Sequence, residues 1–245
     1  MPGVELHARN AAAMWESIAS ACGEVIARTR DVSVTVPSPY HSLRAILLRW
    51  PQDPEAVART VTGLVLARDV PRRTVEDAFG VLPMEAYGFV ARDPMAVMVR
   101  DPGPVPGERP EGVEVVRVTD PDQLAVTERV IVDGFPQTHL QPWVPGRSLP
   151  PRVLGLPGWT VWLARRDGQP AGGGYVYDDT AVGGAYWIAT LPEHRGKGVA
   201  RALVRTMLEN MPDRPMTLTS TAAGEPLYRS LGFGEVSRSW WWNPA

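Results

Sequence analysis

Cysteine is almost absent from this sequence: Cys22 is the only one in 245 residues. One cysteine excludes an internal disulfide framework and a cysteine-rich zinc site, so we expect no metal site and a cytoplasmic location. Neither sign of charge is in excess, because the formal net charge is −2, and no bulk field is expected to attract nucleic acid or an anionic membrane. No apolar run approaches the roughly 18 residues of a membrane-spanning helix. The opening residues, MPGVELHARN, carry Glu5 and lack an apolar segment, so no signal peptide is expected.

Proline and tryptophan, by contrast, are abundant, with 25 and 9 residues. Prolines cluster at 102–110, where they break helical and strand periodicity and predict a linker. A second cluster spans 136–158 and is long for a loop without structure, which is typical of lids and binding walls. Hydrophobic residues make up 44% of the chain and charged residues 21%. This is an ordinary globular balance, and the length allows one large domain or two small ones.

Residues 1–100 have the periodicity of an α/β segment but contain no concentrated chemical motif. Pro54 suits the first position of a helix, and Gly88 suits the residue that closes one. The expected helices cover 8–28, 54–67 and 74–87, and the expected strands cover 43–50 and 97–101.

Beyond the linker the pattern is sharper. Residues 111–119 alternate as a strand, and Asp120 suits the N-cap of a helix over 121–133. Asp167-Gly168 lies between two strand-like runs, which is a hairpin signal. The remaining expected elements are strands at 160–165, 170–177, 181–190, 215–221 and 234–243 and a short helix at 224–233.

The most informative stretch is LPEHRGKGVARALVRTML, residues 191–208. It places a glycine-rich turn between a strand ending in YWIAT and a helix whose apolar residues recur with period 3.6. Gly196 and Gly198 permit close approach to the main chain, and the first helical turn offers unpaired N–H groups and the positive end of the dipole. Arg195 and Lys197 add two charges, and each charge-assisted hydrogen bond contributes on the order of 1.5–3 kcal/mol in a sheltered site. The turn is therefore expected to hold a pyrophosphate without a metal.

Three kinds of phosphate-binding motif compete for this turn. The nucleotide P-loop needs GxxxxGK followed by Ser or Thr, which the sequence lacks. The dinucleotide fingerprint needs GxGxxG directly after a strand, but Arg201 stands at the third glycine. The third is the signature of the GNAT superfamily of acyl-CoA N-acyltransferases: Arg or Gln, two residues, Gly, one residue, then Gly or Ala. Arg195, Gly198 and Ala200 match it in register, and residues 113–240 resemble this family. The alternative to a phosphate-binding site is a glycine turn that only packs tightly before the helix.

The resemblance implies a mixed α/β GNAT fold: a mostly antiparallel twisted sheet flanked by helices, here with an additional N-terminal α/β module. It also implies acetyl-CoA, or another acyl-CoA, as co-substrate. A main-chain N–H near Ile188 or Ala189 would polarise the thioester carbonyl. Thr221 stands where many members have an asparagine on the cofactor chain, and its hydroxyl keeps one hydrogen bond. The other cofactor-binding residues that the resemblance implies are Thr190, Arg195, Gly196, Lys197, Gly198, Val199 and Ala200.

Tyr228 is the catalytic residue that the resemblance implies. It lies in an LYxxxGF pattern and matches the tyrosine that in many members faces the sulfur of coenzyme A. A leaving thiolate, whose thiol has a pKa of ~8.5, can take a proton from a phenol of pKa ~10 if water is excluded and the two are in contact. The alternative is an aromatic side chain that only packs.

No residue stands out as the base that must deprotonate the attacking amine. Asp133, His139, Asp178 and Asp179 are candidates, although the last two suit a turn. Glu193 lies near the pyrophosphate turn and is too far from the expected acyl position to act as the base. Cys22, flanked by small residues, suits a buried, inert thiol better than a covalent relay. We therefore expect direct transfer in a ternary complex.

His139 and Trp143 are the candidates for acceptor binding, because QTHLQPW lies in the proline- and tryptophan-rich loop. A semi-enclosed, partly aromatic pocket favours a small amine over a protein tail as the acceptor. A surface histidine on a loop is the alternative for His139.

The sequence thus predicts three parts: an N-terminal module at 1–100, a Pro/Gly linker at 101–112 and a catalytic GNAT domain at 113–245. Residues 84–101 echo 227–243, since both read as a helix, Gly-Phe and a strand. This echo predicts a degenerate GNAT-like half, and an unrelated helical cap fits equally well.

We predict an acyl-CoA-dependent N-acyltransferase, with acetyl as the favoured acyl group. The alternative is a non-catalytic acyl-CoA-binding sensor, which the missing base and the degenerate-looking half favour. A nucleotide-binding oxidoreductase is a third interpretation, and the missing third glycine argues against it. The C-terminal WWWN predicts either an exposed edge that pairs with a second subunit in a homodimer or a core strand.

Overall fold

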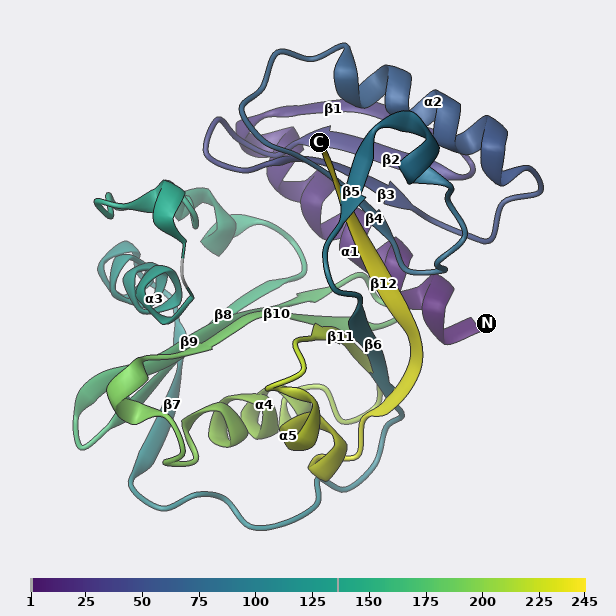
Figure 1. Cartoon of the computed structure of the whole chain (residues 1–245). Helices are drawn as coiled ribbons and strands as arrows, with labels where there is room; N and C mark the ends of the chain where they lie inside the picture. Colours follow the sequence, from purple (N-terminus) through teal and green to yellow (C-terminus); the bar gives the residue numbers. More distant parts are fainter. Residues whose placement is uncertain (1, 136) are drawn as a thin grey trace. The chain divides into compact units, whose positions relative to one another are not determined.

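Helices and strands are interleaved along the whole chain, as the computed structural model shows for residues 2–135 and 137–245 (Figure 1). The helices are α1 (Pro2–Cys22), α2 (Pro54–Leu66), α3 (Pro121–Gly134), α4 (Val199–Glu209) and α5 (Glu225–Ser230), with 3-10 turns η1 (Met84–Tyr87), η2 (Thr138–Leu140), η3 (Pro151–Gly155) and η4 (Pro192–His194). The first strands are β1 (Glu24–Arg28), β2 (Val32–Val36), β3 (Leu43–Leu47), β4 (Arg73–Asp77), β5 (Phe89–Ala91) and β6 (Met95–Arg100). The later strands are β7 (Val113–Val118), β8 (Trp159–Arg166), β9 (Gln169–Asp178), β10 (Gly183–Thr190), β11 (Met216–Ser220) and β12 (Gly234–Pro244). None of the helices described is long and apolar enough to span a membrane.

The chain divides into two units by its internal contacts. Unit 1 comprises Met1–Val99, Thr217–Pro226 and Gly234–Ala245, and unit 2 comprises Arg100–Met216 and Leu227–Phe233. The partition into 1–100, 101–112 and 113–245 stays a prediction.

The sheet of unit 1 draws on both ends of the chain. Its strand order is β1-β2-β3-β4-β12-β6-β11, with β5 beside β12. Only β3 and β4 pair in parallel among the strand pairs whose register is established in this unit, and β12 is antiparallel to β4, β5 and β6. The tryptophan-rich C-terminal strand therefore lies between two N-terminal strands and is a core strand of this unit.

Helices α1 and α2 cover opposite faces of β2 and β3 (Figure 1). On one face, Val34 and Ala45 pack in the same core as Val61 of α2. On the other, the Ser33 hydroxyl bonds to Glu16 of α1 at 2.5 Å, and the Arg44 guanidinium lies 4.9 Å from the centre of the Trp15 ring. Because side chains alternate along a strand, this two-sided burial explains why these strands are almost wholly buried.

A buried histidine joins α1 to β11 within unit 1. His7 is 4% exposed; its Nδ1 lies 2.9 Å from the Thr217 hydroxyl and its Nε2 lies 3.1 Å from the Thr219 hydroxyl. The Thr217 hydroxyl donates to the Met98 carbonyl, so it accepts from Nδ1–H, and Nε2 accepts from Thr219. Burial lowers the pKa of His7 to about 4, and the ring is therefore neutral at pH 7.

Unit 2 has a four-stranded antiparallel sheet, β10-β9-β8-β7, with α3 and α4 on opposite faces. Three consecutive glycines on β9 allow both helices to come close. A Cβ on Gly172 would lie 2.5 Å from Val199 of α4, and a Cβ on Gly173 would lie 2.9 Å from Thr127 of α3. The mostly antiparallel mixed α/β fold expected from the sequence is confirmed.

Two of the predicted helices differ from the structure. The one expected at 8–28 ends at Cys22, because the chain turns at Gly23, where a Cβ would lie 2.0 Å from the Val36 carbonyl oxygen, and continues as β1. The one expected at 74–87 is strand β4 followed by a turn. Both oxygens of the fully buried Asp77 carboxylate accept from four successive main-chain N–H groups, at residues 79–82, which wraps the chain around that side chain. A carboxylate that binds its own downstream backbone competes with helix formation.

The other local predictions agree with the structure. The Asp120 carboxylate accepts from the Gln123 N–H at 2.9 Å and caps α3. Asp167 and Gly168 both have positive φ, of 53° and 76°, as the tight β8–β9 hairpin requires. Residues 105–107 of the predicted linker contact α4, because Arg205 donates to their carbonyl oxygens.

Candidate functional site

The glycine-rich turn between β10 and α4 has the backbone geometry that its sequence predicts. Gly196 and Gly198 adopt φ of +73° and +82°, a region that side chains with a Cβ rarely enter. A Cβ on Gly196 would meet no atom within 4 Å, so that position faces open space. Lys197, between them, is exposed, and its Nζ donates to the Glu193 carbonyl at 2.8 Å. This bond is within the turn itself, and it holds the ammonium group beside the start of α4.

Arg195 ties the turn to its surroundings. Its Nη2 donates to the carbonyl of Gly134, the last residue of α3, at 3.0 Å, and its Nε reaches the Thr190 carbonyl, the last residue of β10, at 3.4 Å. Gly134 is itself close to β10, since a Cβ there would lie 3.0 Å from the Ala189 Cβ. One guanidinium thus joins three elements at the point where the turn begins.

The N-terminus of α4 is uncapped. Its N-cap residue, Gly198, has no side chain to accept a hydrogen bond, and no acidic residue lies in the first turn. The first intrahelical bond runs from the Ala202 N–H to the Gly198 carbonyl at 2.9 Å, which leaves the three preceding N–H groups without a helical acceptor. An anion at this position would gain those donors and the positive end of the helix dipole.

Helix α2 of unit 1 provides the contrast. Its N-cap, Asp53, accepts from the Ala56 N–H at 3.0 Å, and Glu55 lies in its first turn. A carboxylate already satisfies the donors of this helix and would repel a phosphate. Of these two helices, only α4 offers a site for an anion.

Two buried polar atoms near the turn have no hydrogen-bond partner among the described residues: the hydroxyl oxygen of Thr190 and Nδ1 of His194. Buried polar atoms in folded proteins are normally paired, so such atoms are expected where a ligand binds. Together with the open face of Gly196 and the free amides of α4, they fit a diphosphate-bearing ligand with a polar arm along the end of β10.

Strand β10 has a bulge directly before the predicted pantetheine strand. Tyr186 pairs with Tyr175 and Ala189 with Gly173, so β10 has one residue more than β9 across this interval. Trp187 has φ of +53°, which is strained for an aromatic residue, and its ring packs edge-on against Phe135 at 5.8 Å. The bulge takes Trp187 and Ile188 out of the regular ladder to β9 and reorients their main-chain groups.

Tyr228 lies on α5 and is 9% exposed. Its ring contacts Phe233 edge-on, with centroids 5.9 Å apart, and its carbonyl accepts from the Phe233 N–H at 3.0 Å. Burial raises the pKa of its hydroxyl to about 12, so the group is a protonated phenol throughout the neutral range. Thr221, in unit 1, directly follows β11, and its carbonyl accepts from the Gly224 and Glu225 N–H groups.

The segment after α3, residues 137–158, is ordered by α3 itself, and sequence reasoning missed the residue responsible. Glu128 is fully buried (0% exposed), and its carboxylate accepts from the N–H groups of Gly146, Ser148 and Leu149 at 2.6, 2.6 and 2.9 Å. The helical spacing of α3 could have flagged an acidic residue on the buried face. Its partners, about twenty residues downstream, carry no sequence signal because they are backbone groups.

The two predicted acceptor-binding residues lie on this segment. His139 is exposed on η2. Trp143 is half-buried, and the Arg129 guanidinium lies 5.7 Å from its ring centre. Its main-chain N–H donates to Gln141 at 3.1 Å, while its indole Nε1 is buried without a hydrogen-bond partner among the residues described. Pro136, which opens the predicted loop, lies outside the described residues.

The other candidates for a base are engaged elsewhere. Asp133 binds the Gln141 side chain and Arg129. The Asp178 and Asp179 carboxylates accept from N–H groups of the β9–β10 turn, as their sequence context predicted, and Asp178 also pairs with Arg214. Cys22 is half-buried at the end of α1 in unit 1.

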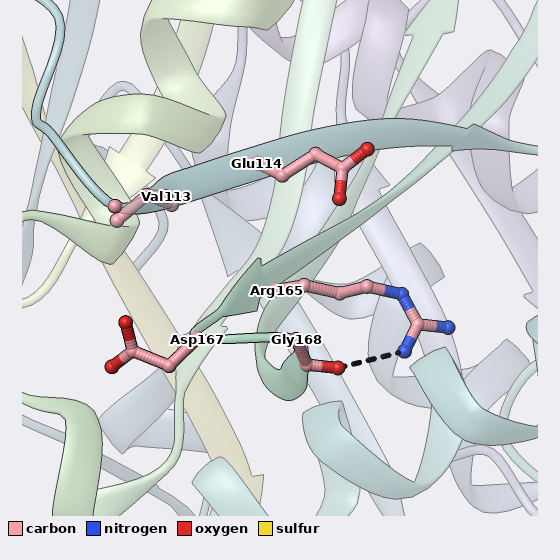
Figure 2. A pocket seen from close by; sticks show the side chains of 6 residues that line it. Val113, Glu114, Arg165, Asp167 and Gly168 are labelled. Atoms are coloured by element: carbon pink, nitrogen blue, oxygen red, sulfur yellow. Dashed lines mark hydrogen bonds between the residues drawn. The ribbon is translucent and has the colours of Figure 1, made fainter.

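Two open hollows in the surface lie away from these residues. One of about 400 Å³ lies at the β7–β8 edge, where Glu114 faces Arg165, and the latter donates to the Gly168 carbonyl at 3.4 Å (Figure 2). Another, of about 260 Å³ in unit 1, is lined by Trp240 and Trp242 among others. Neither contains a predicted site residue. Across the described parts of the chain, no three His, Cys, Asp or Glu side chains gather as metal ligands would.

Comparison with known families decides between the phosphate-binding motifs. The acetyltransferase (GNAT) domain family matches residues 157–235, which include the bulged strand, the turn, α4 and Tyr228. Residues 157–235 are therefore similar to a GNAT acetyltransferase domain. The predicted resemblance is thereby confirmed, and the comparisons give no support to a non-catalytic sensor.

Solved structures share the GNAT fold over nearly the whole chain. A GCN5-related N-acetyltransferase from Kribbella flavida is 18% identical, with a TM-score of 0.69, over 97% of this chain and 95% of its own. A putative GNAT acetyltransferase from Novosphingobium aromaticivorans is 18% identical, with a TM-score of 0.60, over 89% and 90%. A tandem GNAT protein from the clavulanic acid biosynthesis pathway is 19% identical, with a TM-score of 0.56, over 86% and 77%. No curated protein matches the sequence.

Proposed function

We propose that the protein is an N-acetyltransferase that moves an acetyl group from acetyl-CoA to a small amine by direct attack in a ternary complex. The observation that carries the proposal is the uncapped start of α4, with its free amides, flanked by Lys197 and two glycines of positive φ. Bound acyl-CoA would supply the thioester carbonyl that the amine attacks. Val199, Ala200 and Lys197 would hold its pyrophosphate.

The protein's part in the chemistry is to polarise the carbonyl and to protonate the leaving sulfur. A main-chain N–H beside the β10 bulge, at Ile188 or Ala189, would donate to the carbonyl oxygen as negative charge develops there. The new C–N bond forms and the C–S bond breaks, so a thiolate leaves and takes the Tyr228 hydroxyl proton. The proton lost by the amine passes to water, and Tyr228 recovers a proton from water before the next turnover. Burial raises the pKa of Tyr228, which keeps the hydroxyl protonated until the thiolate forms, and the same low-dielectric surroundings would destabilise that thiolate and favour its protonation.

The loop residues His139 and Trp143 are the proposed acceptor contacts. The loop leaves α3 at Phe135, whose ring packs on Trp187 of the bulge, so the wall begins beside the proposed thioester position. An aromatic, partly enclosed wall favours a small amine over a protein tail. A cytoplasmic location and a homodimer stay predictions.

Residues 1–100 are proposed to be a degenerate GNAT-like half. The same order of elements occurs twice along the chain. It consists of a helix, three strands that pair antiparallel, a second helix, a further strand and a short helix. The first copy is α1-β1-β2-β3-α2-β4-η1 and the second is α3-β8-β9-β10-α4-β11-α5. The first copy has Asp53 where the second has Gly198. Calorimetry on the full chain should therefore give one molecule of coenzyme A per chain, and two would contradict this assignment.

The chain offers a direct test of the pyrophosphate site, because Lys197 is its only lysine. An amine-reactive reagent should label Lys197 and the α-amino group. Coenzyme A should protect Lys197 several-fold and leave the α-amino group unchanged, while pantetheine, which lacks the diphosphate, should protect neither. Equal labelling with and without coenzyme A would refute the site.

Activity needs its own test. Thiol release from acetyl-CoA is measured over a panel of small amines and a panel of peptides. An acetyltransferase releases thiol above the hydrolytic background with at least one amine. A sensor would protect Lys197 yet release no thiol with any acceptor.

A further inference from the structure

We propose that Glu128 is a positioning residue that holds the 137–158 segment in place as a preformed wall for the acceptor amine. The inference rests on the proposed function, since it assigns a role within the same site. In the described parts of the chain, the Glu128 carboxylate binds the loop backbone at Gly146, Ser148 and Leu149 rather than the turn or Tyr228.

The burial of Glu128 calls for an explanation. A carboxylate with 0% exposure is costly unless charge-assisted hydrogen bonds replace its lost water. Three main-chain N–H groups, at Gly146, Ser148 and Leu149, do so at 2.6–2.9 Å. Charge-assisted bonds of this length are stronger than neutral ones. The loop backbone is therefore wrapped around one side chain of α3, and Gly146 adopts φ of +80° to allow it.

The same helix fixes the preceding part of the segment. Asp133 accepts from the Gln141 side chain at 3.0 Å, and Gln141 in turn accepts from the Trp143 N–H at 3.1 Å. Arg129 lies against the Trp143 ring. Arg129 and Asp133 of α3 thus hold Trp143, the aromatic residue of the wall, while Glu128 holds residues 146–149.

The wall is connected to the proposed reaction centre through the end of α3. Gly134 lies against Ala189, and Arg195 of the pyrophosphate turn donates to the Gly134 carbonyl. A displacement of the segment would therefore change the space beside the bulged strand, which is where the amine must approach. The indole Nε1 of Trp143 is buried and has no hydrogen-bond partner among the described residues, so it is the unpaired donor on the wall that an oxygen of the acceptor would have to reach.

The test compares Glu128→Gln with Asp120→Ala. The glutamine has nearly the same shape, but it loses the charge and turns an NH2 group toward backbone N–H groups. Asp120→Ala removes the N-cap of the same helix and leaves the loop contacts intact, so it controls for destabilised α3. Trp143→Phe keeps an aromatic ring and removes only the indole N–H. It remains informative if Glu128→Gln does not fold.

We expect Glu128→Gln to raise the KM for the amine about tenfold or more, with the Kd for coenzyme A changed less than twofold. Hydrogen exchange at residues 146–149 and tryptic cleavage after Arg147 should accelerate in this variant and stay unchanged in Asp120→Ala. Trp143→Phe should raise the amine KM without accelerating exchange.

Two outcomes would overturn the inference, and they distinguish failure of the positioning role from failure of the proposed function. If the wild type is active and Glu128→Gln keeps the wild-type KM, or shares its KM change with Asp120→Ala, the positioning role fails and the proposed function stands. If the wild type acetylates no amine although Lys197 is protected by coenzyme A, the proposed function fails, and the acceptor role of the wall fails with it.

Discussion

Acidification should destabilise unit 1 through one side chain, His7. The ring is neutral in the folded state because burial lowers its pKa from 6.5 to about 4, and it bridges Thr217 and Thr219 in a directed chain of hydrogen bonds. In the unfolded chain the imidazole takes up a proton below pH 6.5. The unfolded state then binds more protons than the folded state, so stability falls as the pH falls. Above pH 6.5 both states are neutral and the contribution vanishes.

The size of the effect follows from the two pKa values. Linkage gives a loss of roughly 2 kcal/mol at pH 5 and roughly 3 kcal/mol at pH 4, relative to pH 8. The assay is urea unfolding followed by tryptophan fluorescence at each pH, for the wild type and for His7→Gln. The glutamine removes the titration but keeps one donor and one acceptor. Because the carboxyl groups titrate in both proteins, only the difference between the two pH profiles measures the contribution of His7 to the free energy of unfolding.

A neutral, buried His7 is refuted if the wild type and His7→Gln lose stability in parallel between pH 7 and pH 5. That result would mean that the imidazole is charged, or solvated, in the folded protein. A profile for His7→Gln that is flatter than the wild-type profile by about 2 kcal/mol at pH 5 would support it.

Further substitutions separate binding from chemistry. Tyr228→Phe should lower kcat by about 10- to 100-fold while the Kd of coenzyme A stays within about twofold; equal losses in both would remove the acid role. Gly198→Ala should weaken coenzyme A binding and destabilise the fold by about 1–2 kcal/mol, because φ is +82° and the new Cβ would lie 2.7 Å from Pro110. Gly63→Ala in α2, with no atom within 4 Å of the new Cβ, is the matched control and should stabilise by up to about 1 kcal/mol. Asp53→Ala should cost about 1 kcal/mol of stability and leave the stoichiometry of coenzyme A at one.

The features that the sequence predicts well are those whose causes lie within a few consecutive residues. Asp167-Gly168 specifies its hairpin, and Asp120 specifies the start of α3. The two glycines around Lys197 specify the turn before α4. In each case the backbone conformation and the residue that favours it are neighbours, so a short pattern carries the information.

The features that the sequence does not predict depend on partners far along the chain. Residues 74–77 have helical periodicity, yet they form β4 because β3 and β12 lie on either side. The role of Glu128 is missed because the three N–H groups that bind its carboxylate belong to a loop about twenty residues later in the chain. The Trp187 bulge depends on a mismatch in length between two strands, which no local pattern shows.

The placement of β12 has a consequence for how the protein is made. Strands β4 and β6 leave the ribosome early, but the strand that separates them is synthesised only after all of unit 2. Until then the nascent first unit has an interrupted sheet with two open edges, which invite incorrect pairing. Folding during translation would therefore complete the second unit first, and β12, which is made after it, would close the first.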